Sequence, residues 1–522
     1  MRPEYIIGID SGTSVVKAAV FDLRGNEIAV ASRKTPVIEA EPGWSEFDMD
    51  TDWHETSLAI AEVLAKASIA ADQVAAVGVS GKGIGVCFLD RDLRPVRLGV
   101  LWNDARAVPI MEQWIASGKM DELFDITGNW LGPGDMGLVI PWLMEHEPEN
   151  LARTHTICLP TGWLAYKLTG VLQFNRADAY SQLDILKSEY SDRVMAIEGI
   201  LDHRSIFPEF GNPWDIVGSV TSQAATETGL RAGTPVVRLG FDVVACAAGV
   251  GAIHEGQANI ILGTAGVMEL VLSRPLFEPR QLGVQYIHSV PNTWLKLIAP
   301  MSATPHVDWF VRELAAADQA RAASESRGLF TIFDEEIAKI SPGARGVIFH
   351  PYMSANGERA PFTKTTAKAN FFGLGLHTTR MELLRAIYEG IALSDKHCVD
   401  VSPVPVTDIR LSGGGAKSPI WAQIFADVLD ATISIPAGSE LGAKGAAWNA
   451  AYGAGVFESR EDAVNAFCHV ERVYEPDPTT VEIYADLYEI YKSLVPALWK
   501  PWDARARFLE KVEKTEAEHA LV

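Results

Sequence analysis

The sequence carries little positive charge and no long apolar run. Its 522 residues include 45 lysines and arginines against 67 aspartates and glutamates, which gives a formal net charge of −22. Such a chain has no basic excess to neutralise a phosphate backbone, so nucleic acid is not expected as a partner. No apolar run reaches about 18 residues, and the N-terminus lacks the apolar core of a signal peptide. We therefore expect no membrane contact and a cytoplasmic location.

Cysteines and several well-known motifs are also scarce or missing. The five cysteines lie far apart in the sequence without a Cys-x-x-Cys spacing, which is typical of small buried residues in a reducing compartment. The absence of a Walker A motif excludes a P-loop nucleotidase. No GxGxxG motif opens a βαβ unit with a later acidic residue, which argues against a dinucleotide enzyme. The sequence contains neither an HExxH motif nor a Cys/His cluster, so nothing in it indicates a zinc site. The length favours two large domains.

What the chain does have is a predicted hairpin near its start. Residues 6–22 predict a strand that ends at Asp10, a tight polar turn of Ser11, Gly12, Thr13 and Ser14, and a second strand. Small residues let backbone N–H groups approach phosphate oxygens, and hydroxyls add donors. Because an aspartate at that position would repel phosphate, Asp10 implies Mg²⁺ between them. An ordinary hairpin with a Ser/Thr turn is the alternative.

The second half of the chain repeats this pattern. Gly263, Thr264, Ala265 and Gly266 lie between two apolar strands, as the first turn does. The repetition predicts a duplicated α/β domain with a nucleotide cleft between the copies. We expect an N-terminal domain over residues 1–248, a C-terminal domain over 249–480 and a helical tail, solvated rather than packed, over 481–522.

Asp242 is a candidate catalytic base. It follows the predicted strand PVVRLGF, and open α/β sheets bind their ligands at the carboxyl ends of strands. Transfer of a phosphoryl group from ATP to an alcohol needs a group that accepts the hydroxyl proton. The alternative is a structural role, in which Asp242 caps the following helix.

Two further segments suggest ligand contacts. The turn SGGGAKS at 412–418 follows a strand and precedes a helix, so its glycines expose backbone to a flat adenosine and the helix N-terminus favours anions. A flexible turn is the alternative. The segment LWNDAR at 101–106 places an aromatic ring beside three polar side chains, which is typical of polyol recognition. A solvated loop with one core tryptophan is the alternative.

Together these segments resemble the FGGY carbohydrate kinases of the sugar kinase/actin/Hsp70-like superfamily, over roughly residues 5–455. The resemblance rests on GIDSGTSVVKAAVFD (8–22), PGWSEFDMDTDW (42–53), LWNDARA (101–107), LPTGWLAYKLTG (159–170), GLRAGTPVVRLGFDVV (229–244), LGTAG (262–266), FHPYMSANGERAPF (349–362), FFGLGLHTTRMELLRAIYEGIAL (371–393), SGGGAKSPIWAQIFADVL (412–429) and GAKGAA (442–447). It implies two ribonuclease-H-like domains that close on ATP, Mg²⁺ and a sugar and exclude water.

The resemblance also implies roles for individual residues. Asp10 would organise Mg²⁺ and Asp242 would be the general base. The remaining expected contacts are Gly12, Thr13, Ser14 and Lys17 at the first phosphate clamp, Gly263 and Thr264 at the second, Gly414, Gly415 and Ala416 on the nucleotide, and Lys82, Trp102, Asn103, Asp104 and Arg106 with Asp242 at the substrate.

Two departures from the family bear on the substrate. D-xylulose kinases usually carry Gln-Met-His-Gly where this chain has Lys82-Gly83-Ile84-Gly85, and they and glycerol kinases place an amide after the base, where this chain has Val243. The resemblance is greater to the L-xylulose/3-keto-L-gulonate and erythritol kinases. We expect a kinase of a small ketose or polyol, with D-xylulose or glycerol kinase as the alternative.

Three expectations stay open at this stage. Lys82 either points inward and pairs with the carboxylate of a sugar acid, or is a solvated side chain that points outward. A different activity, an Hsp70-like ATPase or a non-catalytic sugar sensor, would use the same fold. The partner is a small sugar or polyol, and a homodimer is left open.

Overall fold

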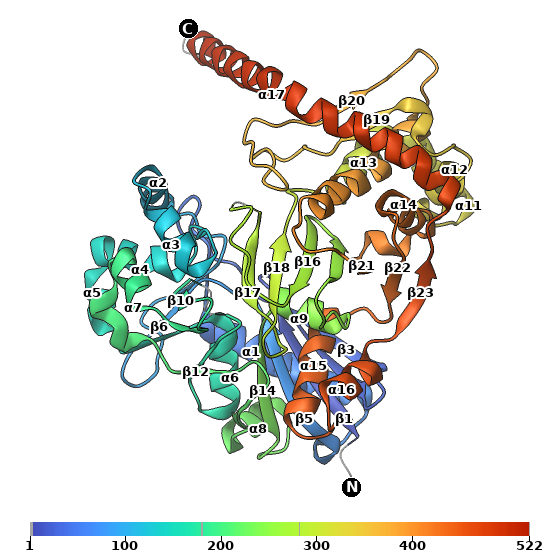
Figure 1. The fold of residues 1–522 in the computed structure, drawn as a ribbon. Helices are drawn as coiled ribbons and strands as arrows, with labels where there is room; N and C mark the ends of the chain where they lie inside the picture. The colour runs from blue at the N-terminus through green and yellow to red at the C-terminus, as the bar shows by residue number, and fades with distance from the viewer. Residues whose placement is uncertain (1–3, 179–180, 281, 521–522) are drawn as a thin grey trace.

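The computed structural model describes residues 4–178, 181–280 and 282–520 (Figure 1). Residues 1–3 and 521–522, at the ends of the expected first domain and tail, lie outside the described residues. Two mixed β-sheets form the centres of two α/β domains, as the family resemblance implies. None of the helices within the described ranges combines the length and apolar character needed to cross a membrane.

The first sheet has the strand order β13-β14-β5-β1-β2-β3. The predicted hairpin is confirmed: β1 and β2 pair antiparallel, and Asp10 faces Lys17 across the pair. Strand β5 runs parallel to both β1 and β14, so the carboxyl ends of these three strands share one edge. The bounds are β1 Tyr5–Ser11, β2 Val15–Asp22, β3 Glu27–Lys34, β5 Val74–Gly81, β13 Ile216–Ser219 and β14 Pro235–Phe241.

The second sheet has the order β17-β18-β16-β15-β21-β22-β23 and repeats this plan. Strands β15 and β16 form the second predicted hairpin, and β21 runs parallel to β15 and to β22. The duplicated α/β fold predicted from the two turns is therefore confirmed. The bounds are β15 Gln257–Leu262, β16 Gly266–Leu272, β17 Val284–Ile287, β18 Trp294–Ile298, β21 Asp408–Gly413, β22 Ile433–Pro436 and β23 Val470–Tyr474.

Helices and short strands cover the sheets and extend the first domain. Helix α1 (Met49–Ala67) begins at Asp48, whose side chain accepts the backbone N–H of Thr51. In the first domain the others are α2 Val108–Ala116, α3 Lys119–Thr127, α4 Met136–His146, α5 Pro148–Arg153, α6 Pro160–Thr169, α7 Asp192–Glu198 and α8 Ser222–Thr228. The short strands are β4 Glu46–Phe47, β6 Cys87–Leu89, β7 Gly99–Val100, β8 Thr156–Cys158, β9 Phe174–Asn175, β10 Leu183–Asp184, β11 Glu189–Tyr190 and β12 Phe210–Gly211.

The second domain has its own helices and one further strand pair. Helix α13 begins with a capping box, in which Thr379 and Glu382 each accept a backbone N–H of the other. The helices are α10 Pro305–Leu314, α11 Ala316–Glu325, α12 Leu329–Ile337, α13 Arg380–Asp400 and α14 Pro419–Leu429, and the strands are β19 Ile348–His350 and β20 Asn370–Phe372.

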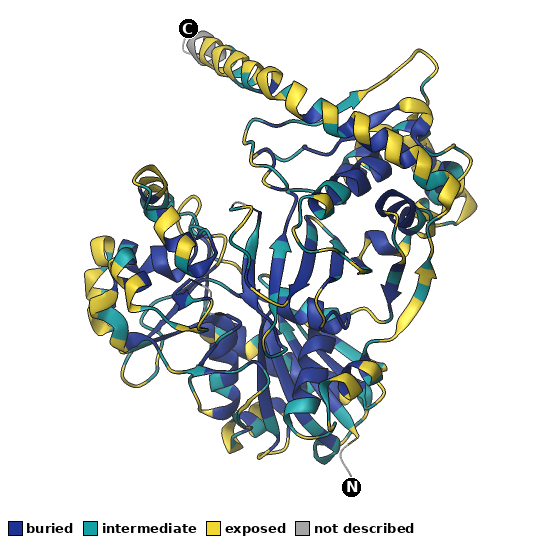
Figure 2. Cartoon of the chain, in the orientation of Figure 1, coloured by how far each residue is buried: buried dark blue, intermediate teal, exposed yellow. Residues whose placement is uncertain are grey.

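The C-terminal helix α17 (Pro478–Ala520) differs from the expected solvated tail. Tyr484, Tyr488 and Tyr491 on its first half are buried in the second core, and Trp502 is buried further along. Beyond this point the helix projects from the body of the molecule with mostly exposed side chains (Figure 2). The expectation is therefore wrong for the first half, where aromatic residues recur at helical spacing and form a buried face.

Two helices join the domains. Helix α9 (Asp242–Gly249) lies between the sheets and contacts α15 (Leu441–Gly453). Although α15 comes late in the chain, it packs on β1 and β5, and with α16 (Arg460–Phe467) it belongs to the first hydrophobic core. The two helices approach closely because Gly249 and Gly445 carry no side chain: a Cβ on Gly445 would lie 2.0 Å from the carbonyl oxygen of Ala245.

Replacement of Gly445 tests this contact. A glycine-to-alanine change inside a helix ordinarily stabilises by roughly 0.5–1 kcal/mol. Gly445→Ala should instead destabilise the protein by about 1–3 kcal/mol, because the new methyl group overlaps α9. Urea denaturation measures the change. Gly162→Ala in α6 is the matched control, since the nearest heavy atom to its added Cβ lies at 3.5 Å, an ordinary contact. Equal stability of both variants would contradict the close contact.

Candidate active site

The strand register brings the two candidate carboxylates to one edge of the first sheet. Asp10 on β1 pairs with Ser80 of β5, and Gly240 on β14 pairs with the same serine from the other side. Asp242 begins α9 two residues after Gly240. Both aspartates therefore lie where parallel strands end, which is where open α/β sheets bind ligands.

The ionisation of the two carboxylates shows that they share an environment. Burial, together with a smaller effect of the neighbouring charge of Asp10, raises the pKa of Asp242 to about 7. Burial raises the pKa of Asp10 to about 6, opposed first by the ammonium of Lys17. The backbone N–H of Val243 donates to Asp242 at 2.8 Å. Like charges this close to each other disfavour double ionisation, as expected of a site built to hold a cation or a proton.

The surroundings of Asp10 fit a magnesium ion held through water and phosphate. Its Oδ1 is buried without a hydrogen-bond partner among the described residues, and a Cβ on Gly442 would lie 2.5 Å from its Oδ2. Lys17 is not free beside it, because its ammonium pairs with Glu440 at 2.8 Å. The described part of the chain contains no cluster of three or more His, Cys, Asp or Glu side chains that could hold a metal. Mg²⁺ commonly needs only one or two carboxylates when phosphates and water complete its shell.

The two glycine-hydroxyl turns stand at matching positions of the two sheets. In the first, the N–H of Gly12 donates to the carbonyl of Val15 at 2.9 Å, while Ser14 is exposed. In the second, the carbonyl of Gly263 accepts both the N–H and the hydroxyl of Thr304, while Thr264 is exposed. Each turn thus leaves one hydroxyl group, that of Ser14 or of Thr264, exposed to a ligand.

A cavity of about 770 Å³ adjoins the second turn. The register pairs Leu262, just before Gly263, with Gly413, so the SGGGAKS turn lies at the same sheet edge. Gly414 and Gly415 line the cavity, and Ala416 lines a smaller one of about 260 Å³ beside it. The larger cavity is also lined by Thr304, Phe330, Asp334, Tyr388, Ser418 and Trp421. Its size and its aromatic walls suit a nucleotide.

The LWNDAR segment divides into two pairs of side chains. Trp102 is 49% exposed and donates its indole N–H to the hydroxyl of Thr13 at 3.1 Å, and Asn103 is exposed beside it. Asp104 and Arg106 are buried and bind each other, with Nε of Arg106 2.8 Å from Oδ1 of Asp104. Arg106 also bonds Glu46 at 2.7 Å. The expectation that Asp104 and Arg106 contact substrate is wrong, because both side chains are buried and their polar groups bind each other and Glu46.

Lys82 fits neither of the two expectations. Its side chain does point inward and is 2% exposed, so the solvated alternative is wrong. Its ammonium, however, lies 2.6 Å from Asp52 and 3.2 Å from the hydroxyl of Ser11, above the ring of Phe47. The positive charge is already paired within the protein, so no free cation remains at this position for a substrate carboxylate.

Removal of one partner tests the Lys82–Asp52 pair. Lys82→Met should lower stability by roughly 3 kcal/mol, because it leaves the Asp52 carboxylate buried without its counter-ion. Lys82→Met combined with Asp52→Leu should recover most of the loss, and urea denaturation measures all three variants. A single variant as stable as the parent would show that the pair is not closed in solution.

The sequence analysis did not identify three residues that lie near the candidate site. Tyr286 and Arg359 belong to the second domain, and Trp130 belongs to the loop at 129–135 of the first. Tyr286 on β17 packs its ring edge-on against Phe241 at 4.4 Å, next to the catalytic candidate. Trp130 and Arg359 line a pocket between the domains. The GERAPF segment around Arg359 and the glycine-rich loop after Trp130 were visible signals, but neither spacing shows which side chain faces the cleft.

Comparison with known proteins agrees with this geometry. The N-terminal domain model of the FGGY family of carbohydrate kinases matches residues 5–249, and the C-terminal domain model matches residues 258–454. The chain belongs to the FGGY family of carbohydrate kinases. It is therefore a phosphotransferase that acts on a sugar hydroxyl with ATP as the co-substrate.

Relatives with different substrates show similar identity. The chain is 28% identical to the L-xylulose/3-keto-L-gulonate kinase of Escherichia coli, over 95% of this chain and 97% of the relative. It is also 28% identical to the erythritol kinase of Brucella abortus, over 97% and 98%. The solved xylulose kinase of Rhodospirillum rubrum superposes with a TM-score of 0.85 at 27% identity, over 96% of this chain and 100% of that one.

Proposed function

We propose that the chain transfers the γ-phosphoryl group of ATP to a terminal hydroxyl of a small ketose or polyol, of the L-xylulose/3-keto-L-gulonate or erythritol type. The observation that carries the proposal is the pair Asp10 and Asp242 at one sheet edge, with the first glycine-hydroxyl turn beside it. An ATPase that drives a partner protein has no need of the exposed Trp102 and Asn103 at this position. Because the donor is ATP, we place the reaction in the cytoplasm.

Asp242 would act as the general base. A carboxylate that accepts the hydroxyl proton works best when its pKa is near the working pH, and burial brings the pKa of Asp242 to about 7. The N–H of Val243 fixes one carboxylate oxygen, which leaves the other for the substrate hydroxyl. Positioning contributes more than base strength, because phosphoryl transfer has a loose transition state.

The remaining contacts would hold the triphosphate. The turns at Gly12–Thr13 and Gly263–Thr264 offer N–H and hydroxyl donors from two sides, and Gly414, Gly415 and Ala416 would contact the nucleoside. Asp10 would hold Mg²⁺ through water, and bound Mg²⁺ would neutralise phosphate charge. Closure of the domains would exclude the water that otherwise competes with the sugar.

The side chain after the base bears on the choice of sugar. Val243 supplies no amide group for a second substrate hydroxyl, which favours the L-xylulose and erythritol groups over D-xylulose and glycerol. An ADP-release assay over ketoses, polyols and sugar acids tests the proposal. Sugar-dependent release supports it, sugar-independent release indicates an ATPase, and sugar binding without release indicates a sensor.

Substitution of the base gives a sharp prediction. Asp242→Asn should lower kcat by a factor on the order of 10²–10⁴, which is the usual contribution of a positioned base. The variant should fold and melt at the same temperature or higher, because it removes a charge that burial disfavours. Turnover at the parent rate would show that Asp242 is not the general base.

The pH profile gives a second prediction. The base works only when deprotonated, so kcat/KM should rise about tenfold per pH unit below the pKa of about 7 and level off above it. The profile of kcat/KM reports the free enzyme, in which this pKa applies. Asp242→Asn should flatten the rise. A flat parental profile across pH 6–8 would contradict a base with this raised pKa.

A further inference from the structure

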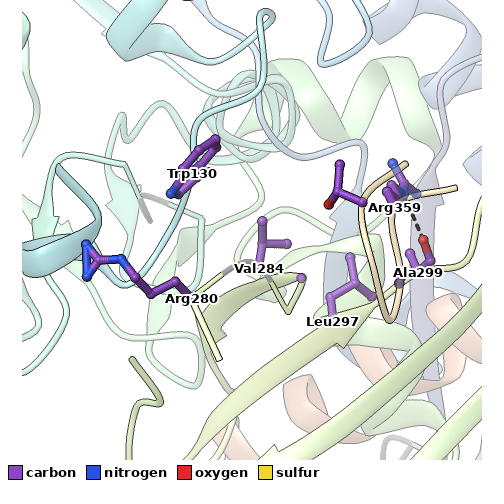
Figure 3. A pocket seen from close by; sticks show the side chains of 9 residues that line it. Trp130, Arg280, Val284, Leu297, Ala299 and Arg359 are labelled. Carbon is purple, nitrogen blue, oxygen red and sulfur yellow. Dashed lines mark hydrogen bonds between the residues drawn. The ribbon is translucent and has the colours of Figure 1, made fainter. Parts of the chain in front are cut away.

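A third pocket lies between the two domains, near the candidate substrate wall (Figure 3). Its volume is about 270 Å³. Trp130 of the first domain lies on one side of it and Arg359 of the second on the other, with Val284 and Leu297 between them. The pocket is large enough for one end of a small sugar but not for a nucleotide.

The pocket adjoins the site of phosphoryl transfer on two sides. Val284 and Tyr286 are two residues apart on β17, so their side chains point to the same face of the sheet. Tyr286 packs on Phe241, the residue before the candidate base. On the other side, the loop that carries Trp130 passes through Gly134, whose added Cβ would lie 2.4 Å from the carbonyl of Trp102. A substrate held between Asp242 and Trp102 would therefore extend toward this pocket.

The lining of the pocket offers hydrogen-bond donors and no carboxylate. The exposed Arg359 donates through Nε to the carbonyl of Ala299 at 2.7 Å, and its guanidinium makes no other hydrogen bond within the described residues. The indole N–H of Trp130 is buried without a partner in the same part of the chain. The neighbouring Glu358 attracts the guanidinium of Arg359, but it forms no ion pair with it among the described residues. Its carboxylate is 2% exposed and accepts the N–H groups of Met301 and Arg359.

The other arginine at the rim is already paired. Arg280 donates to Asp125 at 2.8 Å and its guanidinium points away from the pocket (Figure 3). In a chain with a net charge of −22, a pocket lined by two arginines and no acid is an unusual local reversal of charge. Of the two arginines, Arg359 is therefore the one that has no ion pair among the described residues and can meet an anionic ligand.

We propose that this pocket is the distal subsite of the substrate, and that Arg359 binds a carboxylate there, so that the physiological substrate is a sugar acid. The inference rests on the proposed kinase function and narrows its substrate class. It also places the carboxylate partner at a residue other than Lys82, whose charge Asp52 already neutralises. A planar guanidinium suits a carboxylate because it can donate two parallel N–H bonds to it.

Matched substrate pairs test the subsite. Aldonates and alditols of the same carbon number and configuration, such as gluconate with glucitol and xylonate with xylitol, differ only in a terminal carboxylate. The parent enzyme should phosphorylate the acids with higher kcat/KM. Arg359→Gln should lower kcat/KM for the acids by roughly 10²-fold and change that for the alditols less than about threefold. Arg359→Lys should keep part of the preference.

The control is Arg280→Gln, which should keep the ratio of acid to alditol because that guanidinium is turned to Asp125. The melting temperature and the KM for ATP show whether each variant is folded. A preference of the parent for alditols, or an equal loss on both members of a pair in Arg359→Gln, overturns the subsite while the kinase function stands. Failure of these acids and alditols, and of the ketoses as well, to stimulate ADP release overturns both.

Discussion

The close contact between α9 and α15 is the constraint on which the rest of the site depends. Helix α9 begins with Asp242, and the start of α15 touches Asp10 through Gly442. The two helices meet where Gly445 lies against the backbone of Ala245. A segment from the second half of the chain thereby completes the first core and fixes the two carboxylates relative to each other. The geometry of the base and of the candidate metal position therefore depends on the backbone packing of these two helices.

The sequence predicted the parts of the site that depend on backbone pattern. Asp10 and Asp242 each stand at the end of an apolar strand, and strands that end at one edge must bring their last residues together. Both hairpins and the SGGGAKS turn were also found, because glycine and hydroxyl residues between apolar runs define turns locally. The packing of α15 on the first sheet was not predicted, since periodicity shows that a helix has an apolar face but not which surface it meets.

Side-chain direction was the part that local pattern did not determine. In the LWNDAR segment only Trp102 and Asn103 are exposed, because Glu46, far away in sequence, draws Arg106 inward. Lys82 is paired with Asp52, thirty positions earlier, and no spacing rule connects them. Trp130 and Arg359 lie on opposite sides of one pocket at the domain boundary, which only the assembled fold shows. Long-range charge pairs thus decide which polar residues remain free for a ligand.

A structure of the enzyme with a non-hydrolysable ATP analogue and its sugar tests the central claim most directly. The account predicts that the acceptor hydroxyl lies within roughly 3 Å of the Asp242 carboxylate, in line with the terminal phosphate held between the two glycine-hydroxyl turns. A terminal phosphate directed away from Asp242, or a sugar bound outside the edge where β1 and β14 end, would contradict it.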